Sequence, residues 1–390
     1  MTTSAYAVRP LWAAAGALTT TIACSVPVFL VGGLAVQIGD DLHFSPAGLG
    51  LAVSAYFGAT ALASVPAGTL VERYGSTAIA RYGIALSATS LLAVAALARS
   101  LWSLILILAL GAGANAMGQL ASNTSLSRHV PVRRQGLSFG VKQAAIPVST
   151  LLAGAAVPLV ALTVGWRWAF VLAALGAAGA LWLVPSETDE TKRSNGAGGE
   201  RATAALVVIG LAAMLAAGAA NALGTFLVDS AVARGIAPAP AGLALTLGGL
   251  VCVLARVGGG WQADLLPSRQ VGVIAVLLAT GAIGLALLAV PGTAALILGV
   301  VLGFGLGWSW PGLMNFAVVR LHAQAPAAAT SITQTGVYAG GCVGPLALGA
   351  LAAAAGYPTM WTAAAIAMLS AAALMVVGST MLRRHTATTA

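Results

Sequence analysis

Apolar runs of about 20 residues or more recur along the whole chain and decide what it can fold into. A helix needs about 20 apolar residues to cross a bilayer, where every backbone polar group must be satisfied within the segment. Hydropathy predicts twelve such helices, near residues 11–37, 46–70, 77–98, 101–127, 137–163, 167–184, 203–230, 240–264, 269–290, 293–320, 328–355 and 359–382. With 59% hydrophobic and 7% charged residues, we expect an all-α membrane protein.

The 18 Lys and Arg residues sort by side of the membrane. If the N-terminus is cytoplasmic, thirteen of them lie in or beside cytoplasmic segments, and the external side receives Arg99, Arg167 and Arg234. This asymmetry follows the positive-inside rule, so we expect a multi-pass protein of the plasma (inner) membrane with both termini cytoplasmic. It accounts for the net charge of +9 without a nucleic-acid partner. The expected partners are the lipid bilayer and a small-molecule substrate, and we expect a monomer.

An internal repeat divides the chain into two parts. A shift of 192 residues, or of 191 for the last pair, superposes scarce polar residues: Glu72 on Asp264, Asn123 on Asn315, Arg128 on Arg320, and Gln143 on Gln334. A polar stretch rich in Gly and Ser lies between the two parts and has the composition of a flexible linker. We therefore expect an N-terminal six-helix bundle at 1–184, a cytoplasmic linker at 185–202 and a C-terminal six-helix bundle at 203–390. Transporters built from parallel repeats bind substrate at the repeat interface.

The loop between the second and third predicted spans carries a recognisable motif. Residues 68–75, GTLVERYG, with Arg81 after them, resemble the signature loop of the major facilitator superfamily, with Glu72 in place of the usual Asp. Residues 260–264 are a degraded second copy, and Gly165-Trp166-Arg167 and the glycine-rich stretch 336–349 also resemble that superfamily. The resemblance implies a transporter of twelve helices in two pseudo-symmetric six-helix bundles that works by alternating access.

The motif also implies a gate on the cytoplasmic side. Glu72 can pair with Arg73, with Arg81 or with an arginine of a neighbouring helix when that side is shut, and Arg256 can pair near Asp264 in the second half. The expected gating residues are Gly68, Glu72, Arg73, Gly75, Arg81, Arg256 and Asp264. The alternative is topological: Arg73 and Arg81 only hold the loop inside.

One lysine lies within an apolar run. Lys142 falls several residues into the fifth predicted span, and the other lysine of the chain, Lys192, lies in the polar linker. A charge at membrane depth is costly unless it faces protein or water, so Lys142 is the leading site candidate. The alternative is a side chain that snorkels to the nearby cytoplasmic face. Pro147 can break this helix, and we expect Ser149 and Thr150 to satisfy the freed carbonyls.

Polar residues at helical spacing mark further faces of the predicted path. Asn115, Gln119 and Asn123 form one stripe in the fourth span, and Asn221 and Thr225 begin another in the seventh; in the superfamily, spans one, four, seven and ten line the cavity. The expected substrate-binding residues are Lys142, Gln143, Asn115, Gln119, Asn123, Asn221, Thr225, Trp308, Asn315, Gln334 and Tyr338. The alternative for each stripe is helix–helix hydrogen bonding, which contributes roughly 0.6 kcal/mol per pair.

Two further features of these spans have open interpretations. Trp308 and Trp310 of the tenth span, two residues apart, cannot face the same way on a helix. One is expected to stack on substrate and the other to face lipid or a neighbour. Asp229 continues the stripe of the seventh span and is the candidate for proton coupling, or else an acid that faces the external loop.

Charge guides the choice of substrate. A positive site lined by amides suits a small anion such as a carboxylate, and H⁺ is the expected coupling ion. No acid lies deep in spans one, four or five, where many proton-coupled drug exporters of the superfamily carry one. The rival interpretation is such an exporter of hydrophobic drugs or metabolites, dependent on Asp229 and not on Lys142. A receptor or scaffold of the same fold is a further alternative.

The sequence contains no motif that indicates enzymatic or metal chemistry. The four histidines are scattered through predicted loops and the C-terminal tail, and the cysteines Cys24, Cys252 and Cys342 lie in apolar runs as packing residues. We therefore expect no cofactor, no metal and no enzymatic activity.

Overall fold

The structure is a computed structural model that describes residues 10–131, 135–185, 203–265, 270–321 and 326–389. Its regular structure is helical, and 11 helical segments are long and apolar enough to cross a membrane. The last of these, Ile332–Leu382, has 51 residues, which would extend about 77 Å and exceed twice the ~30 Å hydrocarbon core. It is interrupted at Gly356 (φ 81°, ψ 166°) and therefore makes two crossings. The twelve expected crossings are thus present.

The helices of the N-terminal half alternate between long spans and short pieces. They are α1 (Pro10–Gly33), α2 (Ala35–Leu42), α3 (Pro46–Tyr74), α4 (Ser76–Leu97), α5 (Leu101–Gly111), α6 (Gly113–His129), α7 (Gln135–Gln143), α8 (Ala145–Ala156), the π-turn η2 (Val157–Ala161), α9 (Trp166–Ala180) and the 3₁₀ turn η3 (Leu181–Leu183).

The C-terminal half is built from longer helices. They are α10 (Thr203–Val232), α11 (Pro238–Leu265), α12 (Gln270–Leu288), α13 (Thr293–Leu302), the π-turn η5 (Gly303–Gly307), α14 (Pro311–Leu321) and α15 (Pro326–Thr389).

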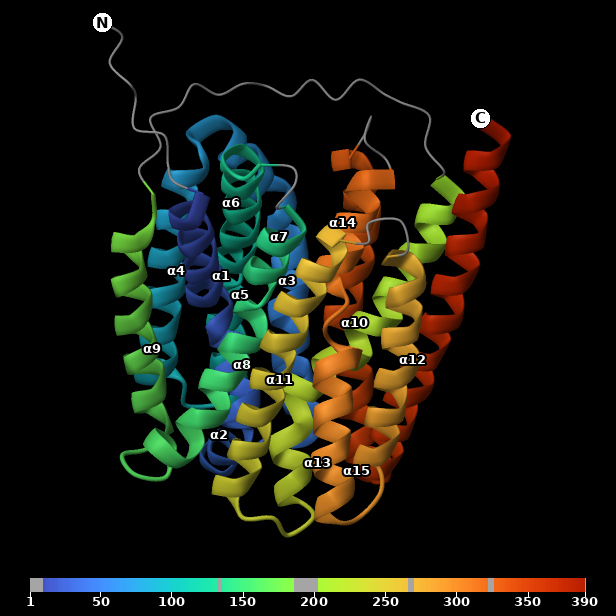
Figure 1. Ribbon diagram of the computed structural model, residues 1–390. Coiled ribbons are helices and arrows are strands. Elements are labelled where there is room, and N and C mark those ends of the chain that lie inside the picture. Colours follow the sequence, from blue (N-terminus) through green and yellow to red (C-terminus); the bar gives the residue numbers. More distant parts are fainter. Residues whose placement is uncertain (1–9, 132–134, 186–202, 266–269, 322–325, 390) are drawn as a thin grey trace, which may run out of the picture.

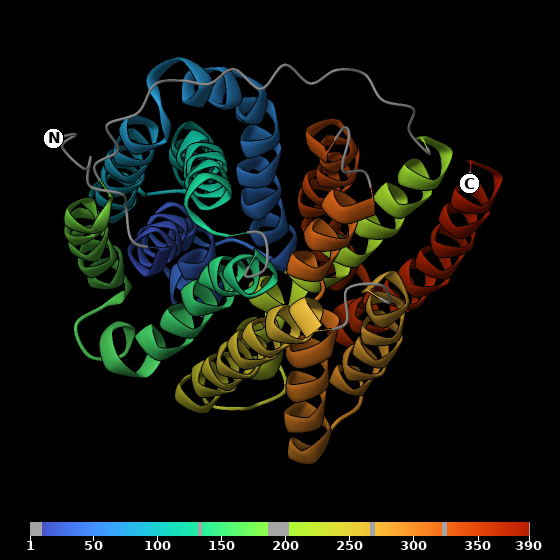
Figure 2. The ribbon, with the colours of Figure 1, turned by 45° about the horizontal axis from the view of Figure 1, so that its top comes forward.

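The two six-helix bundles stand side by side, with the N-terminal half at the left and the C-terminal half at the right of Figure 2. Helix α1 begins and α15 ends at the same end of the molecule, which we call the terminal end; the opposite end is the distal end (Figure 1). Of the predicted linker 185–202, only Pro185 lies within the described residues. Its carbonyl accepts a 2.9 Å hydrogen bond from the Thr77 hydroxyl, which fixes the end of the last N-terminal span to the start of α4.

Four spans expected as single helices are broken, the first of them at Leu34 between α1 and α2. The fourth divides at Ala112 into α5 and α6, the fifth at Ala144 into α7 and α8, and the tenth at residues 308–310 into α13, η5 and α14. In the fifth, Pro147 has no N–H to offer the carbonyl four residues earlier, that of Gln143. Proline again begins the helix after the break in the tenth span, at Pro311.

The expectation for Ser149 and Thr150 was wrong. Their hydroxyls donate to the carbonyls of Ala145 and Ile146, four residues earlier in their own helix, at 3.1 and 3.2 Å. A serine or threonine reaches its own i−4 carbonyl easily, so both hydroxyls lie too far along the helix to serve the carbonyl of Gln143. That carbonyl finds a donor in the other half of the molecule, as described below.

Candidate functional site

Lys142 lies at the end of α7, inside the protein. Its side chain is only 1% exposed, and its ammonium donates a hydrogen bond to Oε1 of Gln119 on α6. The side chain therefore does not snorkel to water. Its hydrogen-bond partner among the described residues is a neutral amide, which solvates the ammonium but does not neutralise it.

Arg256 of α11 joins the two halves. Its Nη1 donates to the carbonyl of Gln143 at 2.5 Å, while Nε and Nη2 donate to the carbonyl of Trp308 at 3.0 and 2.6 Å. Both acceptors are carbonyls at helix breaks, one in the fifth span and one in the tenth. Helix-breaking residues are tolerated in a membrane only where such freed groups are satisfied again. Arg256 does so from a position that is 3% exposed.

The expected pairing of Arg256 with Asp264 is not present. The two residues are eight positions apart on one helix, about 12 Å along its axis. Asp264 instead accepts hydrogen bonds from the backbone N–H groups of Gly136 and Leu137, both at 2.9 Å, at the first turn of α7. A carboxylate at a helix N-terminus satisfies unpaired donors and complements the helix dipole. Asp264 thus fastens the two halves together at the terminal end.

Aromatic side chains pack beside Arg256. The Trp308 ring lies 5.8 Å from the Phe29 ring of α1 and 5.6 Å from the Phe304 ring, and the Arg256 guanidinium lies 5.8 Å from the Trp308 centroid. Trp308 is therefore in contact with the N-terminal half. Of the two alternatives for the tryptophan that does not face substrate, lipid or a neighbour, the structure favours a neighbour, because Trp308 and Trp310 are 4% and 0% exposed. The break at 308–310 lets both turn inward.

The remaining polar candidates divide into three groups. Asn221 and Thr225 bond carbonyls of their own helix, those of Ala217 and Asn221, both at 2.8 Å, and these bonds are not the helix–helix hydrogen bonds of the alternative interpretation. Asn115 and Asn315 each carry a buried side-chain oxygen without a hydrogen-bond partner in the described part of the chain. Partly exposed are Gln119, Asn123, Gln334 and Tyr338, whereas Gln143 is buried.

Glu72, the acid of the predicted gate in the N-terminal half, forms no pair among the described residues. Glu72 and Arg73 are exposed, and the Arg73 guanidinium lies 5.3 Å from the ring of its neighbour Tyr74. Arg81 is also exposed. Gly75 ends α3 with φ 84°, a backbone conformation that favours glycine. No hydrogen bond or ion pair involves Glu72 within the described ranges.

Glycines show where the helices of the two halves pack closely, because a Cβ added at such a glycine would collide with the neighbouring helix. The first contact, seam one, packs α7 and α8 on α11: a Cβ built on Gly140 would lie 2.7 Å from the Arg256 carbonyl oxygen, and one on Gly154 2.5 Å from that of Gly242. The second, seam two, packs α3 on α15, where Gly50 touches the carbonyl of Pro345. Around a Cβ on Gly68, further along α3, no described atom lies within 4 Å. Within the described residues, seam one is closely packed at Gly140 and Gly154, whereas seam two is closely packed at Gly50 and not at Gly68.

Among the described residues, the Asp229 carboxylate has one hydrogen-bond donor. The Tyr357 hydroxyl, just after the kink at Gly356, donates a hydrogen bond to its Oδ2. The carboxylate is partly exposed near the distal end of α10. No contact among the described residues links it to Lys142 or Arg256.

One polar cluster lies at the distal end of the N-terminal half, around Trp166 and Arg167. Sequence analysis named these two residues only because they resemble the family. Asp41 accepts hydrogen bonds from Arg167 Nη1 at 2.6 Å and from the Trp166 indole at 3.1 Å, while Arg167 Nη2 donates to the Ala98 carbonyl at 3.0 Å. The hydrogen bond from Arg167 holds the pKa of Asp41 below its ordinary value. This cluster joins the last turn of α2, the residue after α4 and the first turn of α9 at the distal end of the N-terminal half. The separation of more than 120 residues hid it from motif analysis.

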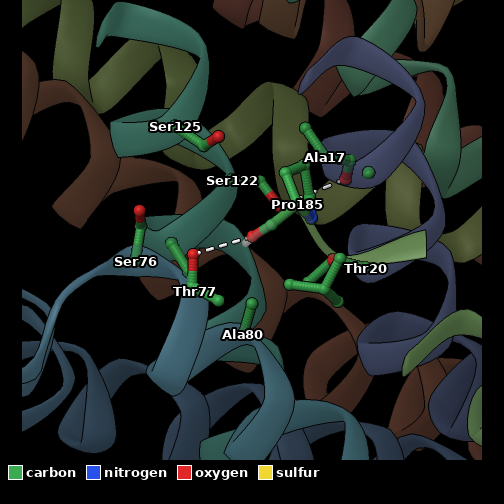
Figure 3. Close-up of a pocket in the computed structure, with 11 residues that line it drawn as sticks. Ala17, Thr20, Ser76, Thr77, Ala80, Ser122, Ser125 and Pro185 are labelled. Atoms are coloured by element: carbon green, nitrogen blue, oxygen red, sulfur yellow. Dashed lines mark hydrogen bonds between the residues drawn. The ribbon is translucent and has the colours of Figure 1, made fainter. Parts of the chain in front are cut away.

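Two cavities lie elsewhere in the N-terminal half. A niche of about 20 Å³, room for one water, is lined by Thr20, Ser76, Thr77, Ser122 and Pro185 among others (Figure 3). An apolar groove of about 470 Å³ lies between α1, α8 and α9. Neither contains any predicted substrate-binding residue. Within the described ranges, no three His, Cys, Asp or Glu side chains could together hold a metal ion.

Twelve membrane crossings in two bundles, with buried cations where the bundles meet, define a polytopic membrane transporter. Residues 14–210, just over half of the chain, match the sequence profile of the Major Facilitator Superfamily, and the chain belongs to that family. A bacterial homologue of the human lysosomal transporter Spinster, crystallised in an inward-facing and occupied conformation, has a TM-score of 0.70 at 16% identity. It covers 97% of both chains, and at this identity the likeness shows the fold alone.

One curated relative is a plant protein. "Probable anion transporter 3, chloroplastic" of Arabidopsis thaliana is 27% identical over 161 residues, which make up 41% of this chain. The match spans only 31% of the relative's length.

Proposed function

We propose that this chain is a secondary active transporter that moves a small organic anion, such as a carboxylate, across the plasma (inner) membrane by alternating access. The observation that carries the proposal is Lys142, a buried cation at the interface of the halves whose hydrogen-bond partner is an amide. A buried charge without a counter-charge is costly, and an anionic ligand removes that cost. The plant relative named as an anion transporter is consistent with this choice. The proposed role is transport without catalysis.

The proposed working cycle follows from the seams. The positive-inside asymmetry assigns the terminal end to the cytoplasm. Close packing of seam two at Gly50 and its absence at Gly68 support a state that would face the cytoplasm. Closure of seam two would then bring Gly68 and Glu72 against the beginning of α15. In this scheme, Gly68, Glu72, Arg73, Gly75 and Arg81 form the moving gate.

The test of anion transport uses the full chain in liposomes. Lys142→Gln should abolish uptake of labelled carboxylates, because the only charge it removes is the one that attracts the substrate. The free energy of unfolding without substrate should change by less than about 1 kcal/mol or increase, since a glutamine retains a hydrogen bond to Gln119. Arg99→Gln, which removes an exposed positive charge, is the control and should transport normally. If Lys142 had a purely structural role, Lys142→Gln would instead lower the free energy of unfolding, and the protein that remains folded would still transport carboxylates.

We further propose H⁺ as the coupling ion and Asp229 as the group that carries it. Its hydrogen bond from Tyr357 holds the carboxylate at the distal end of the C-terminal half, where that half would open to the outside. Asp229→Asn should retain substrate exchange but lose accumulation driven by a pH gradient. Tyr357→Phe, which keeps the carboxylate, should retain accumulation with an altered pH profile. If Asp229→Asn accumulates substrate normally, the proton is carried elsewhere.

The rival function, export of hydrophobic compounds, has one observation in its favour, the apolar groove of about 470 Å³. It predicts that dye efflux is unaffected by Lys142→Gln. Efflux of hydrophobic dyes together with absent carboxylate uptake would replace the anion proposal by this one.

A further inference from the structure

Two buried cations lie at the same level of seam one, one from each half. Lys142 belongs to α7 of the N-terminal half and Arg256 to α11 of the C-terminal half, with exposed fractions of 1% and 3%. The Arg256 guanidinium binds the carbonyl of Gln143, the residue next to Lys142 in the sequence. The two halves thus present two like charges to each other.

The acidic residues in the described part of the chain leave these cations unneutralised. Asp41 is held by Arg167 and Trp166, Asp229 by Tyr357, and Asp264 by the N–H groups of α7. Asp40 and Glu72 are exposed. The remaining four acids of the chain lie in residues 187–200, outside the described ranges. Two like charges buried together in this way are strongly unfavourable unless something else supplies negative charge.

Both cations keep hydrogen-bond donors in reserve. Within the described part of the chain, Lys142 uses one of its three N–H donors on Gln119, and Arg256 uses three of its five on the two carbonyls and also bonds the Cys252 thiol. Arg256 is oriented by those carbonyls, so its remaining donors are fixed in direction before a ligand arrives. Preorganised donors lower the entropy lost on binding.

We propose that the ligand of this site is a small dianion, a dicarboxylate or a phosphate-like oxyanion, held by Lys142 from one half and by Arg256 from the other. The inference rests on the proposed anion transport and adds the charge of the substrate and a binding role for Arg256. A monoanion would leave one buried cation uncompensated, whereas a dianion neutralises both. Because each half supplies one cation, the bound dianion also removes the repulsion between the halves and favours their closure around it.

The experiment compares succinate with its monomethyl ester, which differ by one charge, at about pH 7, where the free carboxyl groups of both compounds are already ionised. Binding is measured by thermal shift of the purified full chain and by uptake into liposomes, with inorganic phosphate as a third ligand. The wild-type protein should bind succinate at least tenfold more tightly than the ester, the size expected for one charge-assisted hydrogen bond. Lys142→Gln and Arg256→Gln should each remove this preference. Arg99→Gln should keep it.

Each outcome decides one claim. Equal binding of succinate and ester by the wild-type protein would overturn the dianion while leaving anion transport standing. If the protein binds none of succinate, the ester and phosphate but transports a neutral or cationic solute, both the dianion ligand and the proposed anion transport are wrong. If Arg256→Gln does not fold, Arg256→Lys replaces it and should keep the preference for succinate, because the charge is retained. A preference that survives Lys142→Gln would also contradict the proposal.

Discussion

At the scale of single residues, prolines within membrane helices determine where polar side chains are needed. Pro27 frees the carbonyl of Ala23, which accepts a 2.6 Å hydrogen bond from the Ser87 hydroxyl, and Pro147 frees that of Gln143 for Arg256. Sequence predicts the freed carbonyl, since it is always four residues earlier. It does not predict the donor, which in these two cases lies 64 and 113 residues away. Lys142, in contrast, could be identified from the sequence, because a charge within an apolar run stands out even when its partner is unknown.

Stability of Arg256 variants tests this explanation. Arg256→Gln should lower the free energy of unfolding by about 1–3 kcal/mol, because two buried carbonyls lose their donors. Pro147→Ala restores the N–H that the Gln143 carbonyl lacks, so it should recover part of that loss in the double variant. Denaturant unfolding of the four proteins forms a double-mutant cycle. Additive effects would show that Arg256 does not serve this carbonyl.

At the scale of helices, the internal repeat predicts the same packing at equivalent glycines of the two halves, and the structure shows that packing in only one half. Gly68 and Gly260 occupy equivalent positions, 192 residues apart, so symmetry expects both to be packed. A Cβ on Gly260 would lie 2.7 Å from the Gly136 carbonyl oxygen, while none of the described atoms is within 4 Å of one on Gly68. The repeat shows which helices are equivalent. It cannot show which of two equivalent seams is closed, because both halves carry the same small residues.

Leucine substitutions separate the two glycines. Gly260→Leu should destabilise the protein by about 1–3 kcal/mol or more, since its side chain must displace the backbone of α7. Gly68→Leu should leave the thermal midpoint unchanged, yet stop transport by preventing closure of seam two. Thermal unfolding and liposome uptake measure the two effects. Normal transport by Gly68→Leu would mean that seam two does not close at this glycine.

At the scale of the whole molecule, hydropathy and the repeat together predict the fold. Twelve crossings, two bundles and the family follow from patterns that a bilayer imposes on any chain. The conformational state does not follow, because the two states of a carrier use the same helices and differ by only a few kcal/mol in how the halves pack. The contact between Ser54 and Cys342 across seam two is a feature of the conformational state and does not follow from the sequence patterns. Their Oγ and Sγ atoms are 3.5 Å apart, although the residues are 288 positions apart in sequence.

Ser54→Cys therefore offers a lock for the distal end. The new thiol would face the native Cys342, and oxidation by copper phenanthroline should join the two halves, since disulfides require neighbouring Cβ atoms. Transport should stop on oxidation and return on reduction, because seam two can no longer open at the distal end. The same protein carrying Cys342→Ser is the matched control and should transport under both conditions, with Cys24 and Cys252 still buried and unpaired. A cross-linked protein that still transports would show that the halves do not separate along this seam, and would remove alternating access between the two bundles as the mechanism.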